Sequence, residues 1–318
     1  MAKITQKIKK FIREGGEKRM RKILVLSICA AFMVIGARSA YALIPIMWDV
    51  SKAGAPAHGD ADSRTWVFDE FGIKAQTTTI QYDSDGSGTL TVGDAFTDIG
   101  DLRVTDLLAA GVIDKEGLND LFGYEVTGIW DDLGGTVTGL SVVGTDTRID
   151  IQYTSGTIDF YLDTPPDSLF ANPAGTSPPA GAGGTGFGPD ASATLIAQGT
   201  VTQGIGHTFI DFGGGELENQ GSIELMIDLT YLLPGFWLDS SGNDLLNNSI
   251  QWIFAFTDMN INTPTLVQGT PAGALYTAYS NEDGSGHIEI IPEPTSLLLL
   301  GGGLLGFVGI GLRKRRSA

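Results

Sequence analysis

A run of twelve residues has the residue types and spacing of a calcium-binding loop. It reads Asp83-Ser84-Asp85-Gly86-Ser87-Gly88-Thr89-Leu90-Thr91-Val92-Gly93-Asp94. In the 12-residue loops that bind calcium, oxygen ligands stand at positions 1, 3, 5, 7 and 12, and a glycine at position 6 makes the sharp turn. Gly88 takes that sixth position here. The candidate Ca²⁺ ligands are the side chains of Asp83, Asp85, Ser87 and Asp94 and the backbone carbonyl of Thr89.

Two departures from the calcium-loop pattern leave an alternative open. Position 12 is Asp94, whose side chain is shorter than the usual Glu, and residues 80–82 before the loop look extended rather than helical. The alternative is a tight polar hairpin turn, which Asp-Gly-Ser-Gly makes without metal. A partial echo of the run spans residues 281–289. Its twelfth position falls on Pro292, which has no ligating side chain, so we predict a hairpin turn there.

The sequence contains no motif of enzymatic catalysis. The histidines His58, His207 and His287 lack metal-ligand spacing, and there is neither a G-x-S-x-G nor a Walker-type Gly-Lys-Ser/Thr. Acid pairs such as Asp131-Asp132 could serve a glycosidase, which needs two carboxyl groups ~5–9 Å apart. Chance pairs are expected in so acidic a chain. We therefore predict a protein that is not an enzyme.

Charge is divided sharply along the chain. The formal net charge is −17, but residues 43–294 hold 35 acidic and only 6 basic side chains, a net of −29. Such a body repels phosphate backbones, which excludes nucleic acid as a partner and leaves divalent cations or basic surfaces. A solvated acidic surface that maintains solubility is the alternative. The single cysteine, Cys29, lies in a segment expected to be removed, so no disulfide is predicted.

Alternation of apolar and polar residues predicts an all-β, antiparallel body of the β-sandwich or jelly-roll type. The predicted strands are residues 77–82, 136–143, 148–153, 158–162, 193–201, 222–229, 250–256 and 274–280. Residues 154–157 are predicted to be a hairpin turn between two of them. Residues 105–122 depart from the alternation and favour one or two short helices, which Gly111 and Gly117 interrupt.

A Gly/Pro-rich stretch at residues 171–190 divides the body into β-rich regions 43–170 and 191–291. It is predicted to be either a linker between two lobes or a long loop in a single sandwich. Tryptophans such as Trp66, Trp130, Trp237 and Trp252 could stack on sugar rings if exposed, or pack in the core.

The N-terminal region reads as a secretory signal peptide. A basic start at Met20-Arg21-Lys22 precedes an apolar stretch over residues 23–36, and Ala40-Tyr41-Ala42 is an A-x-A site. We predict export through the Sec translocon and cleavage by signal peptidase after Ala42. Residues 1–42 then form an extended n-region plus signal, with Met20 as the candidate start. The alternative is a retained membrane anchor.

Residues 292–318 form a second targeting segment. Pro292, Glu293 and Pro294 precede an apolar stretch over residues 297–312, followed by the basic residues Arg313, Lys314, Arg315 and Arg316. Sixteen helical residues span about 24 Å of a ~30 Å hydrocarbon core, and snorkelling arginines can bridge the rest. The basic cluster should stop transfer and stay cytoplasmic, which places residues 43–291 across the membrane.

This order of Pro-Glu-Pro triplet, short apolar helix and basic end resembles the PEP-CTERM sorting domain. The resemblance covers residues 292–316 and implies that exosortase, an integral-membrane enzyme, recognises Pro292, Glu293 and Pro294 and processes the chain. The C-terminal helix would then be a transient membrane anchor; an anchor that is never cut is the alternative. The layout is also similar to that of flocculation-associated PEP-CTERM proteins.

The resemblance implies an exported protein that passes through an inner-membrane intermediate to the cell surface or extracellular matrix. We expect a non-enzymatic role in exopolysaccharide, biofilm or floc formation. The alternative is a secreted polysaccharide-binding module or polysaccharide-active enzyme, with exopolysaccharide as the candidate partner in either case.

Overall fold

The structure is a computed structural model, and its description is confined to the body of the chain. The described residues are 42–55, 63–114, 117–119, 123–164, 193–210, 221–246, 250–261, 265–266 and 273–290. Residues 1–41 of the predicted signal peptide, the Gly/Pro-rich stretch 171–190 and the sorting tail 292–318 lie outside them, whereas Ala42, the last residue of the predicted signal, is described. Residues Ala42–Ile290 form one compact unit.

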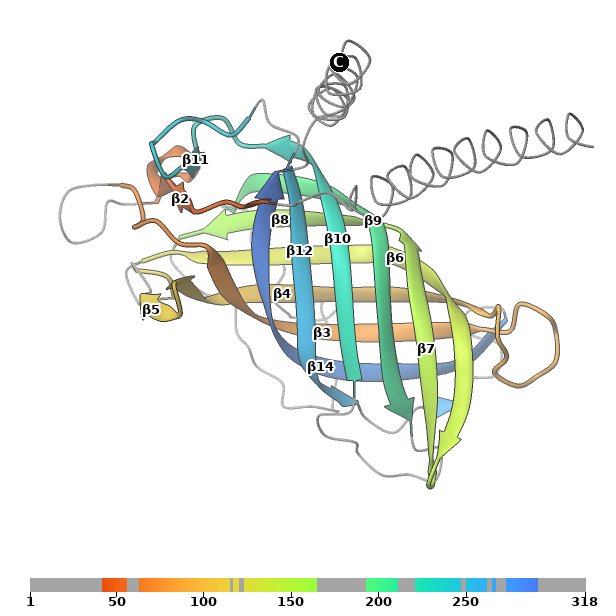
Figure 1. Ribbon diagram of the computed structural model, residues 1–318. Helices are drawn as coiled ribbons and strands as arrows, with labels where there is room; N and C mark the ends of the chain where they lie inside the picture. Colours follow the sequence, from red (N-terminus) through yellow and green to blue (C-terminus); the bar gives the residue numbers. More distant parts are fainter. Residues whose placement is uncertain are drawn as a thin grey trace, which may run out of the picture. The chain divides into compact units, whose positions relative to one another are not determined.

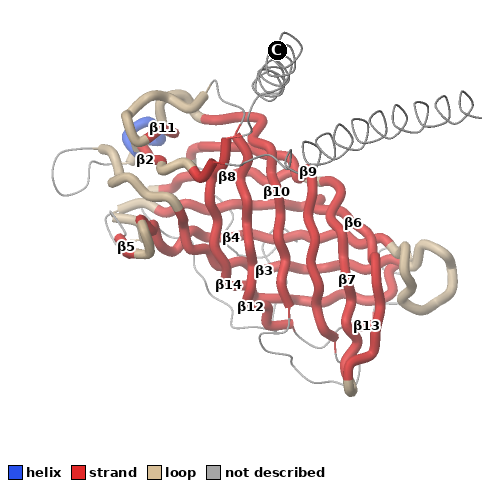
Figure 2. Tube along the Cα trace, viewed as in Figure 1, coloured by secondary structure: helices blue, strands red, loops and turns tan. Residues whose placement is uncertain are grey.

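Antiparallel strands make up nearly all of the described chain, which confirms the all-β prediction (Figure 2). The one helical segment within these ranges is the short 3₁₀ helix η1 (Val50–Ala53). The strands are β1 (Ala42–Leu43), β2 (Ile46–Trp48), β3 (Glu70–Tyr82), β4 (Ala95–Ala109), β5 (Val112–Asp114), β6 (Glu125–Val143), β7 (Asp146–Ser155), β8 (Thr157–Asp163), β9 (Thr194–Ile210), β10 (Gly221–Leu232), β11 (Trp237–Asp239), β12 (Ile250–Ile261), β13 (Thr265–Leu266) and β14 (Ala274–Ile290).

The main sheet closes on itself. Neighbouring strands follow the order β4-β3-β14-β12-β10-β9-β7-β6, and β6 pairs in turn with β4. In Figure 1, β12, β10, β9 and β7 run in one layer and cross β3, β4 and β14 in the layer behind. The two layers form the sandwich-like body that the alternation predicts. Closure protects most strands from the unpaired edges that promote aggregation.

Both β-rich regions of the sequence contribute to this one sheet. Strand β8, from the first region, pairs with β9, from the second, along residues Thr157–Leu162 and Thr194–Thr200. The first and last described strands also meet, since Ala42 and Leu43 in β1 pair with Ile290 and Glu289 in β14. The two ends of the body therefore lie side by side.

Aromatic side chains fill one end of the interior. Trp252 contacts Phe160, Trp237 and Phe71, with ring centroids 4.2, 5.0 and 5.7 Å apart. Burial of each such side chain contributes on the order of 2–3 kcal/mol, and edge-to-face contacts add to this. Trp130, Trp237 and Trp252 are buried in this core. They pack the interior and are not exposed platforms for sugar rings.

The helices predicted in residues 105–122 are not present where the structure describes that stretch. Thr105–Ala109 ends strand β4, which turns through Ala110 and Gly111 into β5. Both turn residues have positive φ, 50° and 78°, as a two-residue hairpin turn of type I′ requires. Pairing of β4 with β3 overrides the helix-like spacing of the leucines. Leu121 and Phe122 lie outside the described residues.

The hairpin predicted at residues 154–157 is also wrong. Strands β7 and β8 do not pair with each other; both lie between β6 and β9 and follow one course along them. Gly156, at φ 122°, produces a bend between them, and Asp132 Oδ1 accepts a hydrogen bond from Thr157 N at 2.9 Å. A Cβ on Gly156 would lie 2.5 Å from the side chain of Leu133. Here glycine marks a bend in the sheet rather than a reversal.

The echo at residues 281–289 is not the predicted hairpin turn either. It lies inside β14, which pairs with β12 on one side and β3 on the other through Asp283, Gly284 and Gly286. Gly286 is needed for packing, because a Cβ there would lie 2.5 Å from the ring of Phe71. The Gly-Ser-Gly sequence thus makes room for core aromatics instead of making a turn.

Candidate functional site

Strands β3 and β4 present the predicted calcium loop. They pair from Glu70↔Leu108 to Gln81↔Phe96, and residues 83–94 connect their ends. The run is therefore the connection of a β-hairpin, and its flanks are strands as residues 80–82 suggest. Gly86 and Gly88 take φ values of 75° and 73°, the left-handed conformation that glycine adopts without strain.

The loop brings three of its predicted ligands together. One carboxylate oxygen each from Asp83, Asp85 and Asp94 lies within 4.8 Å of the other two. The two predicted ligands Ser87 and Thr89 lie in the same loop, where Ser87 Oγ donates to the Thr89 carbonyl at 2.8 Å. Oxygens bound to one Ca²⁺ at 2.3–2.6 Å are up to about 5 Å apart, so the spacing of the three carboxylates suits that ion.

Backbone amides hold these carboxylates in place. Asp83 accepts from Ser87 N at 3.0 Å and Gly88 N at 2.8 Å. Asp94, only 1% exposed, accepts from Ser84 N at 2.9 Å and Thr91 N at 2.7 Å. Hydrogen bonds from Ser87 lower the pKa of Asp85 and favour its charged form. The loop thus concentrates negative charge at one point, which a divalent cation would neutralise.

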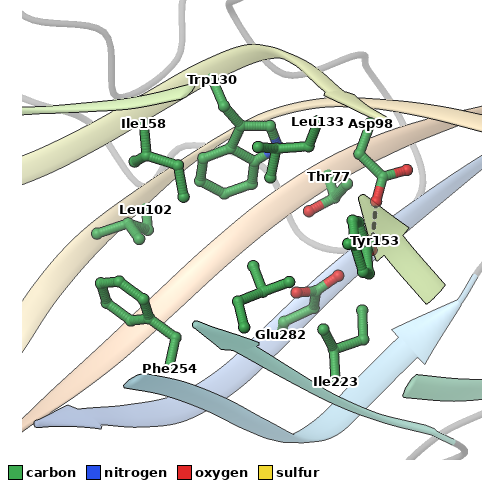
Figure 3. Close-up of a pocket in the computed structure, with 11 residues that line it drawn as sticks. Thr77, Asp98, Leu102, Trp130, Leu133, Tyr153, Ile158, Ile223, Phe254 and Glu282 are labelled. Carbon is green, nitrogen blue, oxygen red and sulfur yellow. Dashed lines mark hydrogen bonds between the residues drawn. The ribbon is translucent and has the colours of Figure 1, made fainter. Parts of the chain in front are cut away.

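A second polar cluster lies inside the closed sheet (Figure 3), and no motif in the sequence predicts it. Asp98 on β4, Tyr153 on β7 and Glu282 on β14 point into the interior and are 3%, 3% and 4% exposed. The Tyr153 hydroxyl donates to Asp98 Oδ2 at 2.5 Å, and Ser280 Oγ donates to Glu282 Oε1 at 2.7 Å. Within the described chain, Asp98 Oδ1 has no hydrogen-bond partner.

Small cavities adjoin these carboxyl groups. One of about 40 Å³ is lined by Asp98, Tyr153 and Glu282 together with Gln81 and Ser280, and another of about 10 Å³ lies beside it. Among the residues that the structure describes, no lysine or arginine lines either cavity. Such volumes accommodate water molecules, whereas ligand pockets run to several hundred Å³.

Burial raises the pKa of both acids. The pKa of Asp98 rises to about 6, and that of Glu282 to about 7, where the nearby Asp98 charge adds to the effect of burial. Burial and the Asp98 charge also raise the pKa of Tyr153, so its phenol stays protonated and donates to Asp98. The cluster holds protons near neutral pH.

The outer face of the sheet carries a third feature, an open groove of about 610 Å³ over β7, β9 and β10. Gln152, Ile205 and Glu224 are successive cross-strand partners along one row of the groove. Asp150, His207 and Ser222 form the next row. These residues come from alternating positions of ordinary strands, and only their register brings them together.

The remaining residues singled out by type lie apart from these sites. Asp132 of the candidate acid pair holds the bend at Thr157, while Asp131 is exposed. His287 lies within β14, and His58 lies outside the described residues. Among the described residues, no helix combines the length and apolar character needed to cross a membrane.

Comparison with known proteins identifies one segment. The PEP-CTERM protein-sorting motif matches residues 291–316. No curated protein matches the sequence. Among solved structures, the outer membrane protein OprG from Pseudomonas aeruginosa aligns with 69% of this chain and 95% of its own, at 11% identity and a TM-score of 0.12, a value too low to carry any argument. The chain carries a PEP-CTERM protein-sorting motif and is thereby an exported protein of the kind that exosortase sorts.

Proposed function

We propose that the protein is a non-enzymatic component of the cell surface or extracellular matrix that associates with exopolysaccharide in biofilm or floc. The observation that carries this proposal is the sorting motif at residues 291–316, attached to a closed, acidic antiparallel sheet. The Sec translocon and signal peptidase would act at the N-terminal segment. Exosortase would then act at Pro292, Glu293 and Pro294, with the C-terminal helix as a transient membrane anchor.

The end of the body supports processing at that position. Strand β14 pairs up to Ile290, so the recognition triplet begins two residues after the last paired residue. The two prolines of the triplet lack the N–H that a sheet ladder needs and disfavour a helical residue before them, so its sequence favours an extended, unpaired segment. An extended, unpaired segment is what a membrane enzyme can grip.

Calcium is proposed as a structural partner of the loop at residues 83–94. Asp83, Asp85 and Asp94 would supply carboxylate oxygens. Ser87 Oγ and the Thr89 carbonyl would complete the set of oxygen ligands once the hydrogen bond between them is broken. The bound ion would fix the connection between β3 and β4. It carries no catalytic role in this proposal.

One observation favours a second candidate function, that of a polysaccharide-binding module. The outer groove on β7, β9 and β10 gathers amide, hydroxyl, imidazole and carboxylate groups in a volume of about 610 Å³. Binding of this kind is compatible with a matrix role, because a matrix protein must hold its polysaccharide. Polysaccharide cleavage is the alternative that needs a direct test.

Two measurements separate a non-enzymatic matrix role from polysaccharide cleavage. Deletion of the gene should reduce floc or biofilm formation, and re-expression should restore it. The exported protein incubated with exopolysaccharide of the producing cell should release no reducing sugar. Release of reducing ends above a heat-treated control would replace the matrix role with an enzymatic one. Unchanged aggregation after deletion, with no turnover, would remove the matrix proposal.

A further inference from the structure

The groove on the outer face is built from two cross-strand rows with different chemistry. The first row places the exposed Ile205 between Gln152 and Glu224, and Ala255 of β12 continues it beyond Glu224. Ile205 is 55% exposed although it lies in the middle of a polar face. Side chains opposite each other in an antiparallel sheet are about 5 Å apart. The row is therefore an apolar centre flanked by an amide and a carboxylate.

The second row supplies an imidazole and a hydroxyl, which donate and accept hydrogen bonds, and a carboxylate, which accepts them. His207 Nδ1 and Ser222 Oγ are 3.2 Å apart, and Asp150 is the partner of His207 on the other side. Thr138, at a register shift in β6, adds a hydroxyl at the margin of the groove. A ligand in the groove therefore meets several groups that can donate or accept hydrogen bonds, at the spacing of neighbouring strands.

The charges of the groove do not favour an anionic ligand. The one guanidinium among the described residues of the groove, that of Arg148, is bound to Asp150 through Nη2 at 2.8 Å and Nε at 2.9 Å. Glu224 adds a second carboxylate. The groove thus has two carboxylates against one arginine that already has a partner, within a strongly acidic body. A phosphate, sulfate or uronate group would be repelled.

We propose that this groove binds an uncharged saccharide chain. The inference rests on the proposed association with exopolysaccharide and assigns it a site. Sugar hydroxyls both donate and accept, which the groups of Gln152, His207, Ser222 and Glu224 complement. The C–H face of a sugar ring would lie on Ile205. A bound chain would run across the strands, along the rows.

The groove is less suited to a protein strand. Each strand that lines it already pairs on both sides, so the groove offers no free backbone edge for strand addition. Its exposed apolar surface is centred on the single residue Ile205, smaller than the apolar patches at which proteins commonly associate. Side-chain hydrogen bonds to a hydroxyl-rich ligand remain the chemistry that the groove can supply.

Affinity electrophoresis of the exported protein tests the site. The gel contains the uncharged fraction of the exopolysaccharide of the producing cell, separated by anion exchange, with alginate as the anionic comparison. We expect retardation of the wild type by the uncharged fraction and none by alginate. In Gln152→Ala/Glu224→Ala the dissociation constant should rise about thirtyfold, because two hydrogen bonds that contribute roughly 1 kcal/mol each are lost. Ile205→Thr, which keeps a β-branched side chain, should weaken binding severalfold.

Asp283→Asn is the matched control, because it removes one exposed carboxylate from β14, outside the groove. Its binding should equal that of the wild type, and unfolding in urea verifies that all variants fold. If the wild type is retarded but the groove variants are retarded equally, the groove is not the site and the matrix function stands. If the uncharged fraction does not retard the wild type, or only alginate does, the proposed saccharide recognition is wrong. This conclusion does not depend on the effect of gene deletion on aggregation.

Discussion

Asp98 and Glu282 are carboxylic acids buried in the interior, where ionisation is unfavourable, and the stability of the body therefore depends on pH. Both lie in the interior beside small cavities, and the described residues that line these cavities include no lysine or arginine. Removing a carboxylate from water without a cationic partner disfavours its charged form. The Tyr153 hydroxyl compensates only Asp98 Oδ2, since Asp98 Oδ1 has no hydrogen-bond partner among the described residues.

The first prediction concerns the pH dependence of stability. The pKa of Asp98 is about 6 in the folded protein, and that of Glu282 about 7, both above their ordinary values of 3.8 and 4.5. The folded state therefore holds protons that the unfolded state has released. The contribution of this pair is most favourable below pH 4 and is lost as pH rises through 7. Urea unfolding across pH 4 to 8 measures it.

Asp98→Asn isolates one member of the pair, because an amide oxygen can still accept from Tyr153. A pKa rise of about two units corresponds to roughly 3 kcal/mol, so at pH 8 this variant should be more stable than the wild type by up to that amount. At pH 4 the difference should vanish. Asp283→Asn, at an exposed position, should leave the pH profile unchanged. A parallel profile for Asp98→Asn and the wild type would contradict the assignment.

At the scale of elements, Gly156 shows how one residue turns a strand without reversing it. Its φ of 122° and its closeness to Leu133 exclude a side chain, and the bend lies where the pairing of β7 with β6 shifts register, before β8 continues along β6. Gly144, at the tip between β6 and β7, also has positive φ, 67°, but open space around it. The two glycines share a positive φ, which would strain a residue with a Cβ, and they differ in packing.

Substitution of these glycines separates strain from overlap. Gly144→Ala should cost about 1 kcal/mol of unfolding free energy, the penalty of positive φ alone. Gly156→Ala should cost about 2–4 kcal/mol, because strain and overpacking both apply. Denaturant unfolding at fixed pH gives both values. Equal costs would mean that Leu133 moves aside freely and that the bend does not depend on close packing.

The calcium loop yields a prediction at the same scale. Ca²⁺ should raise the melting temperature by several degrees, because a ligand that binds only the folded state stabilises it by mass action. In Asp83→Ala/Asp85→Ala the rise should disappear, and the melting temperature in chelator should fall only modestly, because the lost hydrogen bonds from Ser87 N and Gly88 N are exposed. Mg²⁺ at equal ionic strength controls for screening of the acidic body. A loop that shows no rise with Ca²⁺ is a hydrogen-bonded hairpin connection without metal.

Local patterns predicted the strands well but could not predict how strands meet. Alternation located most strands, including residues 148–153 and 222–229 within β7 and β10. The same glycine-rich signals had three outcomes, a loop at Gly88, a bend at Gly156 and a paired strand at Gly286. Packing against Leu133 and Phe71 decides the last two cases. The predicted calcium residues come together because they lie in one loop.

Sites that depend on register stayed invisible in the sequence. Asp98, Tyr153 and Glu282 come from three strands, and the closed sheet alone brings them together. The groove rows likewise depend on which residue of β9 faces which residue of β7 and β10. One local signal could have identified Asp98. It is an acid at an inward position of an alternating strand, since the buried Phe96 and Leu102 lie an even number of residues away on either side of it.

At the scale of the whole molecule, the two ends of the body are neighbours. Ala42 pairs with Ile290 across β1 and β14, so the predicted signal peptide and the sorting motif attach at one point of the sheet. Removal of both segments takes only Ala42 from the sheet, because all other strand residues lie between Leu43 and Ile290. The body needs neither targeting segment for its core.

The last prediction is that export trims both ends. The protein recovered outside the cell should begin at Leu43, end within or beside the triplet at residues 292–294, and be lighter than the full 33.6 kDa. In Pro292→Ala/Glu293→Ala/Pro294→Ala the N-terminal cut should remain while the C-terminal cut is lost, because the predicted recognition residues are gone and alanine no longer disfavours helix there. That variant should stay in the membrane fraction.

Intact mass spectrometry of both fractions determines the two termini at once, with Asp283→Asn as the control for expression. Full-length protein found only inside the cell, with neither end removed, would contradict the sorting route, and normal trimming of the triplet variant would place recognition elsewhere.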